Sequence, residues 1–352
     1  MVSYINSREY AECMSRPASA DNCGLEIGPL HHPFVKKDST GKNIYYTDYR
    51  SSEELREANK DNPEVDVNDI VDIDFVWNPT KSLRECIPQD MMFDYVAASQ
   101  VVEHVPDTIG WIRQLFSVVK VNGVLSLGVP DCRYTFDAYR NTTTVAELLE
   151  AYIREEKIPT VRQIYDNISL AIDDSREEVI DTSVPFAERK KLYTLKNALD
   201  FAEYSYFHEE YLDAHCTVWT PESFAAVFNE LNEIGLLNCK VEVVSIKDTG
   251  SFVAYITKTA DMELRTLPES RERKLQNECA HLHKAYEEAV NIQKKLSTEL
   301  QESKSATQLR EENEHLRKAY KEAVDLQQAM KKEIKRLKEE LGEDDDEEEE
   351  DE

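Results

Sequence analysis

Short apolar runs alternate with amphipathic segments between Asp21 and Lys258. Several runs are apolar at nearly every position, as strands buried on both faces of a parallel sheet are. They lie near 23–27, 43–47, 69–74, 93–98 and 124–129. The segments between them predict crossover helices, and the alternating runs at 240–246 and 251–257 predict a closing antiparallel hairpin. The pattern therefore predicts an α/β domain over residues 21–258.

Two segments depart from this alternation. Residues 1–20 predict a short leading helix or N-terminal arm. Residues 141–200 are rich in charge, and the stretches 145–153 and 189–201 carry apolar residues at helical spacing. We therefore expect a helical insertion at about 141–200.

The pattern changes again after Lys258. Residues 269–341 contain no proline, and apolar residues recur every seven positions among Glu, Lys, Gln and Arg. The two series are Leu275, Leu282, Ala289 and Leu296, then Leu309, Leu316, Ala323, Met330 and Leu337. These heptads predict a long α-helical coiled coil after a linker at 259–268, with a disordered acidic tail at 342–352. The alternative is a single solvated helix, but its leucine stripe needs a partner, so we expect a homo-oligomer.

The charge of the chain limits its partners. The formal net charge is −28, and the ten acids of residues 343–352 leave −18 for the rest. Affinity for nucleic acid comes mainly from clustered Lys and Arg, so nucleic acid is not an expected partner. We also expect no transmembrane segment, because no run of 18 apolar residues exists. Seven scattered cysteines and a polar start favour a reduced, cytoplasmic protein.

A candidate cofactor site follows the first apolar run. The run closes on Gly28, and the next one ends on Asp48. In α/β sheets such a glycine lets the backbone approach an adenosine cofactor, and such an acid accepts the ribose hydroxyls. Residues 29–32 (PLHH) replace the further glycines that would hold a pyrophosphate. The pattern therefore favours a nucleoside cofactor without phosphates, S-adenosylmethionine.

Further candidates lie at the carboxyl ends of later strands, where open α/β sheets bind ligands. Asp74 would receive the adenine amino group, although Asp72 competes for that role. His104 is the first candidate for the general base, since its ordinary pKa lies near neutrality; the alternative is that it only caps the next helix. The strand at 93–98 is followed by three more expected cofactor residues, Ser99, Gln100 and Glu103.

Two other groups have competing interpretations. Arg133 follows the fifth predicted strand and would shape the acceptor pocket, or would lock the turn by pairing with Asp131. The segment from His208 to His215 holds His, Glu and Asp residues that a divalent metal accepts as ligands. It lacks the H-E-x-x-H spacing, so we expect no metal site.

Two stretches resemble class I S-adenosylmethionine-dependent methyltransferases: FDYVAASQVVEHVP at the fourth strand and KVNGVLSLGVP at the fifth. The resemblance implies a Rossmann-like fold, in which Glu26 fixes the cofactor's amino group; a buried, internally paired acid is the alternative. LEIGPL, EHVPDTIGW, PDCRYTFDAYR and HCTVWTPESF are similar to a methyltransferase type 11-like branch encoded beside glycosyltransferases in surface-polysaccharide clusters.

That branch implies O-methylation of a sugar hydroxyl on a surface glycan or its precursor. It also implies a glycosyltransferase complex that would hold the enzyme at the inner face of the membrane. Asp213 and His215 fall in its Tyr-x-Asp-x-His stretch and would act on the acceptor side, whereas Asn167 stands where relatives have histidine. The alternatives are a non-catalytic scaffold acting through its coiled coil, or an enzyme whose acceptor is a lipid, a small molecule or a protein.

Overall fold

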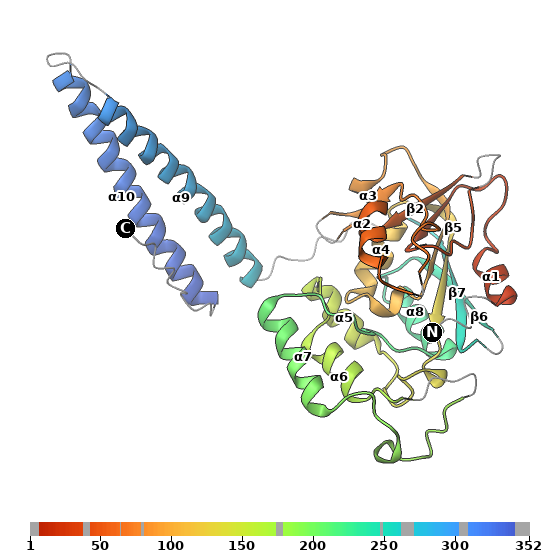
Figure 1. Cartoon of the computed structure of the whole chain (residues 1–352). Helices are drawn as coiled ribbons and strands as arrows, with labels where there is room; N and C mark the ends of the chain where they lie inside the picture. The colour runs from red at the N-terminus through yellow and green to blue at the C-terminus, as the bar shows by residue number, and fades with distance from the viewer. Residues whose placement is uncertain are drawn as a thin grey trace. The chain divides into compact units, whose positions relative to one another are not determined.

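A mixed sheet of seven strands is the centre of the N-terminal part of the chain (Figure 1). The computed structural model describes residues 7–37, 43–63, 65–78, 81–173, 179–246, 249–261, 271–302 and 309–341. The chain divides into two compact units, Met1–Leu264 and Arg265–Glu352.

The strands run in the order β3-β2-β1-β4-β5-β7-β6. Their bounds are β1 Gly24–Ile27, β2 Ile44–Asp48, β3 Phe75–Val76, β4 Phe93–Ser99, β5 Val119–Pro130, β6 Cys239–Ile246 and β7 Ser251–Lys258. The first five are parallel, and β7 pairs antiparallel with both β5 and β6. The order reverses between β1 and β4, and such a reversal opens a ligand crevice at the carboxyl ends of the strands.

Helices connect and cover the strands. Their bounds are α1 Arg8–Met14, α2 Ser52–Asn59, α3 Leu83–Cys86, α4 Thr108–Phe116, α5 Val145–Arg154, α6 Val161–Ser169, α7 Leu195–His208 and α8 Pro221–Glu233. Three 3₁₀ turns are η1 Val102–His104, η2 Cys132–Tyr134 and η3 Phe186–Glu188. The sequence signals their starts: Thr220, for example, caps α8 with its side chain, and Pro221 takes the first turn.

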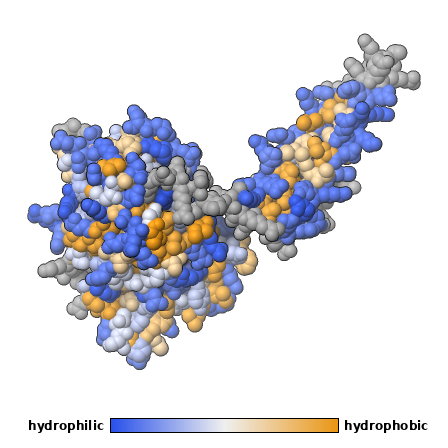
Figure 2. All heavy atoms as spheres, turned by 180° about the vertical axis from the view of Figure 1, so that it is seen from behind, coloured by the Kyte–Doolittle hydropathy of each residue, from blue (hydrophilic) through white to orange (hydrophobic). Residues whose placement is uncertain are grey.

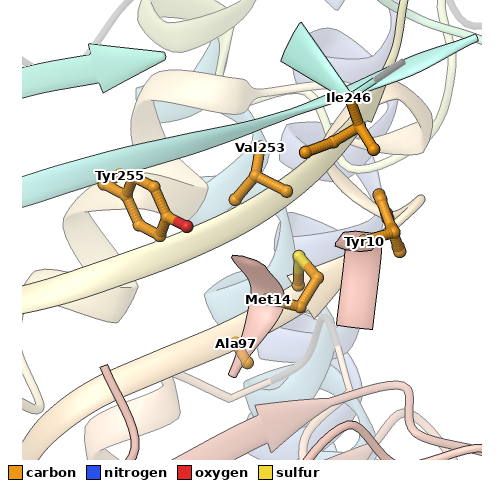
Figure 3. Packing of buried hydrophobic residues seen from close by; sticks show 6 residues of the cluster. All are labelled: Tyr10, Met14, Ala97, Ile246, Val253 and Tyr255. Atoms are coloured by element: carbon orange, nitrogen blue, oxygen red, sulfur yellow. The ribbon is translucent and has the colours of Figure 1, made fainter. Parts of the chain in front are cut away.

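The leading helix α1 is part of the core. Tyr10 and Met14 are fully buried against residues of β4, β6 and β7, as Figure 3 shows. Gly128 makes this approach possible, because a Cβ there would lie 1.9 Å from the Tyr10 hydroxyl oxygen. The same hydroxyl is 2.7 Å from Ser99 Oγ. Helix α1 therefore supports the carboxyl end of β4.

The third strand lies later than the sequence pattern predicts. Strand β3 covers only Phe75–Val76, not residues 69–74. Side chains rather than a ladder satisfy part of the earlier segment, since the backbone N–H of Ile73 donates to Ser52 Oγ at 2.9 Å. Asp72 pairs with Arg56 at 3.0 Å. Asp74 therefore precedes the strand instead of ending it.

The expected helical insertion consists of α5, α6 and α7, and α7 runs beyond residue 200 to His208. Helices α6 and α7 lie side by side (Figure 1), and Ile164 and Ala202 pack together with Ala214 between them. Ala214 belongs to the extended segment 209–220, which leads from α7 to α8. The insertion therefore anchors this segment, which carries two of the candidate site residues.

The second unit consists of α9 Arg271–Glu302 and α10 Leu309–Leu341, which pack against each other. They carry an internal repeat, HLHKAYEEAV from His281 and HLRKAYKEAV from His315. Equivalent residues make reciprocal hydrogen bonds: Gln293 Nε2 donates to Tyr320 Oη at 3.3 Å, and Gln327 Nε2 donates to Tyr286 Oη at 3.1 Å. Contacts between residues so distant in sequence exclude one straight helix over residues 269–341.

The pairing leaves some apolar residues of the second unit exposed. Ile292 is 56% exposed and Leu326, its equivalent in the repeat, is 51% exposed. Figure 2 shows apolar side chains on the surface of this unit. Residues 262–268 of the predicted linker and the acidic tail 342–352 lie outside the described residues. In the part of the chain that is described, no helix is long and apolar enough to cross a membrane.

Candidate active site

Three predicted cofactor residues lie at one level of the sheet edge. Ile27 pairs with Thr47 of β2 and with Ala98 of β4. The next residue in each chain segment is Gly28, Asp48 and Ser99, respectively. The parallel register therefore brings these three residues side by side, and the Gly28 N–H donates to Thr47 O at 2.9 Å.

The backbone around this edge has left-handed turns. Gly28 has φ +64°, and the nearest atom to a Cβ built there would be Val101 Cγ2 at 3.7 Å. Gln100 has φ +55°, which is unusual for a residue with a side chain. Its Nε2 is buried, and the described residues offer it no hydrogen-bond partner. A left-handed glycine turn without a side chain and a buried amide without a partner among the described residues suit the approach of a polar ligand to this edge.

Glu26 holds the loop that follows β1. Its carboxylate accepts hydrogen bonds from the backbone N–H groups of Phe34, at 2.8 Å, and Val35, at 3.2 Å. Burial raises the pKa of Glu26 to about 7, and these two bonds oppose the rise. Its carboxylate therefore organises the loop from Gly28 to Val35.

Asp48 lies at the carboxyl edge of the sheet, where a cofactor would bind, whereas Asp74 does not. Asp48 ends β2 at the sheet edge; its Oδ1 accepts the Tyr49 N–H at 2.7 Å, and burial raises its pKa. Asp74 lies at the other end of β3 and binds Lys37 Nζ and the Tyr46 N–H, both at 2.7 Å. Its expected place at the carboxyl edge is wrong, because the strand begins after it. Trp77 stands at that edge, and its backbone N–H donates to the backbone carbonyl of Asp48 at 2.8 Å.

The acceptor-side candidates form one cluster. Turn η1 follows β4 and carries Glu103 and His104, while the segment after α7 carries Asp213 and His215. His104 Nδ1 lies 2.8 Å from Asp213 Oδ1. The rings of His104 and His215 are perpendicular, with centroids 4.8 Å apart. The fold therefore unites residues more than 100 positions apart in the sequence.

Hydrogen bonds fix both the ring and the backbone of His215. Its Nδ1 lies 2.5 Å from Oδ2 of Asp137, and its backbone N–H donates to Asn167 Oδ1 at 3.1 Å. Arg140 donates from Nη2 to His215 O at 2.9 Å and from Nη1 to Asp137 Oδ1 at 2.7 Å. Although burial opposes the charge of Asp137, His215 and Arg140 hold its pKa below the ordinary value. The ring of His215 is thus fixed with Nε2 free of this network.

The carboxylate of Glu103 has fewer hydrogen-bond partners than the other side chains of the cluster. Its side chain is 1% exposed, and neither carboxylate oxygen has a hydrogen-bond partner among the described residues. Burial raises its pKa, and Oε1 lies 3.9 Å from His104 Nε2. Burial lowers the pKa of His104, but its hydrogen bond to the Asp213 carboxylate and the charge of Glu103 hold that pKa above the ordinary value. Ligand atoms of Glu103, His104 and His215 all lie within 4.8 Å of one another.

The remaining candidates lie apart from this cluster. Arg133 makes a two-pronged ion pair with Asp131, at 2.9 Å from Nε and 2.5 Å from Nη2, so the turn-locking alternative describes its contacts. His208 stacks on Tyr204 instead of joining His215. Glu103, also expected beside the cofactor, differs from these two because it is a member of the cluster, with Oε1 3.9 Å from His104 Nε2.

Sequence reasoning missed two residues of the cluster, Asp137 and Arg140. Both lie in PDCRYTFDAYR, a stretch noted for its resemblance but not for these residues. An Asp and an Arg three positions apart are common as a surface pair, so their burial beside His215 was needed to identify them.

The fold is that of a Rossmann-like methyltransferase. It has a parallel sheet that ends in an antiparallel pair, with a glycine turn and an acid at the carboxyl edge. Residues 4–232 match the model of the family described as "Methyltransferase domain", and the chain belongs to this family. It is a class I S-adenosylmethionine-dependent methyltransferase.

Solved structures similar to the chain include methyltransferases at low identity. The plantazolicin methyltransferase BpumL, in complex with SAH, is 8% identical with a TM-score of 0.35, and the match covers 71% of this chain and 83% of that one. The CcbJ methyltransferase from Streptomyces caelestis is 12% identical with a TM-score of 0.36, covering 73% and 96%. These scores are too low to add to the family match. No curated protein matches the chain.

Proposed function

We propose that the protein is an O-methyltransferase that methylates a sugar hydroxyl of a surface glycan or its precursor. The observation that carries the proposal is the cluster of Glu103, His104, Asp213 and His215, whose first member lies four residues after β4 ends. Gly28, Asp48 and Gln100 stand at the same edge of the sheet. Gln100 of the predicted donor site therefore lies three residues before Glu103 of the ionisable cluster.

The residues at the edge fit S-adenosylmethionine. Gly28 makes a left-handed turn that has no side chain, Gln100 offers a buried amide without a partner among the described residues, and Asp48 would accept the ribose hydroxyls. When bound, this cofactor supplies a methyl group on a positively charged sulfur, which keeps the electron pair of the broken bond. Glu26 acts indirectly in this proposal, since it holds the loop beyond Gly28.

The cluster suits an uncharged hydroxyl acceptor. A hydroxyl must lose its proton as the new O–C bond forms, and a positioned imidazole can accept it. His104 and His215 each use Nδ1 on a carboxylate, which leaves Nε2 for the acceptor. The carboxylates of Glu103, Asp137 and Asp213 would repel an anionic acceptor such as a phosphate or another carboxylate.

Two further features support a sugar. The resemblance of the sequence to the polysaccharide-associated branch suggests one, together with a glycosyltransferase complex at the inner face of the membrane. Tyr211 is 47% exposed, and its hydroxyl donates to Asp213 at 3.1 Å, so an aromatic face with a polar tip borders the cluster. We further propose that the second unit forms a coiled coil that joins copies of the chain through exposed apolar residues such as Ile292 and Leu326.

The test uses donor labelled in its methyl group, purified full-length protein and separate glycan, lipid and protein acceptors. Label recovered in glycan and released by glycosidase digestion supports the proposal. Label found only in lipid or protein would assign another acceptor. Calorimetry with Gly28→Val and Asp48→Ala tests the donor site: both variants should weaken donor binding, with His208→Gln as a control that does not. A wild-type protein that does not bind donor at millimolar concentration would instead be a scaffold.

A further inference from the structure

We propose that Glu103, His104 and His215 bind a divalent transition-metal ion. The three side chains combine two imidazoles and one carboxylate, a ligand set used by zinc enzymes and by non-haem iron enzymes. Their ligand atoms lie within 4.8 Å of one another, so small side-chain rotations would bring all three to bonds of about 2.1 Å with a single ion. Imidazole ligands favour zinc, iron, cobalt or nickel over magnesium or calcium.

The histidines are oriented as metal ligands are. A ligating histidine ordinarily donates its second ring nitrogen to a carboxylate, which fixes the ring and its tautomer. His104 has its Nδ1 on Asp213 at 2.8 Å, and His215 has its Nδ1 on Asp137 at 2.5 Å. Both rings therefore keep Nε2 for an ion, and the His104 Nε2 lies 3.9 Å from Glu103 Oε1.

Glu103 supplies an independent observation. A buried carboxylate without partners is costly unless a cation or donor compensates it. Both oxygens of Glu103 are buried, and no other described residue provides a hydrogen bond to either. Its backbone carbonyl accepts the N–H groups of Cys216, at 2.6 Å, and Thr217, at 3.1 Å, so the turn and the histidine segment are fixed to each other.

The site would be catalytic in type rather than structural. Three protein ligands leave at least one coordination position for water or substrate. For this role the inference rests on the proposed function: the acceptor hydroxyl would take the open position, and the ion would lower the pKa of that hydroxyl. In the metal-bound enzyme His104 and His215 would be ligands rather than bases, and the proton of the bound hydroxyl would pass to solvent water as the new O–C bond forms. They would act as bases only in the metal-free protein.

The experiment is a metal titration of full-length protein after removal of metals with a chelator. Calorimetry measures Zn²⁺ binding, and the visible absorption of Co²⁺ reports its coordination by nitrogen and oxygen. We expect one tight site per chain in the wild type. Glu103→Gln keeps the shape of the side chain but removes the charge, and it should abolish that site. Asp213→Asn removes the carboxylate that pairs with His104. Because Asp213 is largely exposed, the fold should tolerate the change, and the affinity for metal should fall by about 10–100-fold.

His208→Gln is the matched control, because His208 belongs to the same sequence segment but stacks on Tyr204 away from the cluster. It should bind metal as the wild type does. A wild type without a tight site, or a Glu103→Gln variant that binds metal normally, would overturn the metal site whatever the donor measurements show. Loss of donor binding with an intact metal site would instead contradict the proposed reaction. Thermal unfolding separates these outcomes from misfolding, since Zn²⁺ should raise the melting temperature of the wild type and not that of folded Glu103→Gln.

Discussion

Glu26 lies in surroundings unlike those of an ordinary glutamate. It is 2% exposed, and two backbone N–H groups are its hydrogen-bond donors. Loss of water dominates, so its pKa rises to about 7. At a pH between the ordinary pKa of glutamate and this value, Glu26 keeps its proton in the folded protein but has lost it in the unfolded chain. Its contribution to stability is therefore full below the unfolded pKa and is lost as the pH rises through about 7.

This linkage predicts the behaviour of Glu26→Gln. The wild type should lose about 3 kcal/mol of unfolding free energy through Glu26 between pH 4.5 and pH 7. The variant lacks this titration, so the difference in stability between the two proteins should change by that amount. Denaturant unfolding at pH 5 and pH 8 measures it. Parallel pH profiles for the two proteins would show that Glu26 is not desolvated as described.

At the scale of elements, the paired helices α9 and α10 are organised by a repeat. Gln293 and Tyr286 of the first copy bond Tyr320 and Gln327 of the second. Polar residues at the seam of a coiled coil specify register at some cost in stability. The reciprocal pairs therefore fix one alignment of the two helices, and identical contacts are available to two copies of the chain.

Single alanine substitutions test this symmetry. Gln293→Ala and Gln327→Ala should each destabilise the paired helices by up to about 1 kcal/mol, because each removes one hydrogen bond, which is exposed at Gln293 and part-buried at Gln327. Gln328→Ala, at an exposed neighbouring position, corrects for the higher helix propensity of alanine. Thermal melts followed by circular dichroism give the values. A large difference between the two variants would contradict the reciprocal arrangement.

At the scale of the molecule, the two units have separate cores. The unit Met1–Leu264 contains the sheet, the donor edge and the histidine cluster, and Arg265–Glu352 contains the paired helices. A division of this kind allows catalysis and self-association to be changed separately.

A chain truncated after Leu264 should therefore bind donor with affinity within about two-fold of the full-length protein, because every residue of the candidate site is retained. It should also be monomeric, since the exposed apolar residues Ile292 and Leu326 are removed. Light scattering measures the mass, and calorimetry measures donor binding. If the truncated protein kept the oligomeric state of the full-length chain, the interface would lie in the first unit.

The sequence by itself determined the class of fold and the positions of Gly28 and Asp48 at the edge of the sheet, while their roles toward a donor stay predictions. Buried parallel strands require continuous apolar runs, and a left-handed turn favours glycine, so local pattern was enough to place these two residues. The predicted α/β sheet and its antiparallel closing pair are confirmed. The short strand β3 was misplaced because side chains such as Ser52 and Asp74 satisfy backbone groups that a ladder otherwise pairs.

Only the tertiary structure decided which residues meet at the acceptor side. Glu103, Asp137 and His215 come from three separate segments, and their energetics depend on burial, which no local pattern records. The same holds for Arg133, whose contacts are with Asp131, and for the return of α10 along α9. Apolar periodicity fixes which face of an element is buried. The packing of the whole chain decides which element covers that face and which buried charged side chains have no partner.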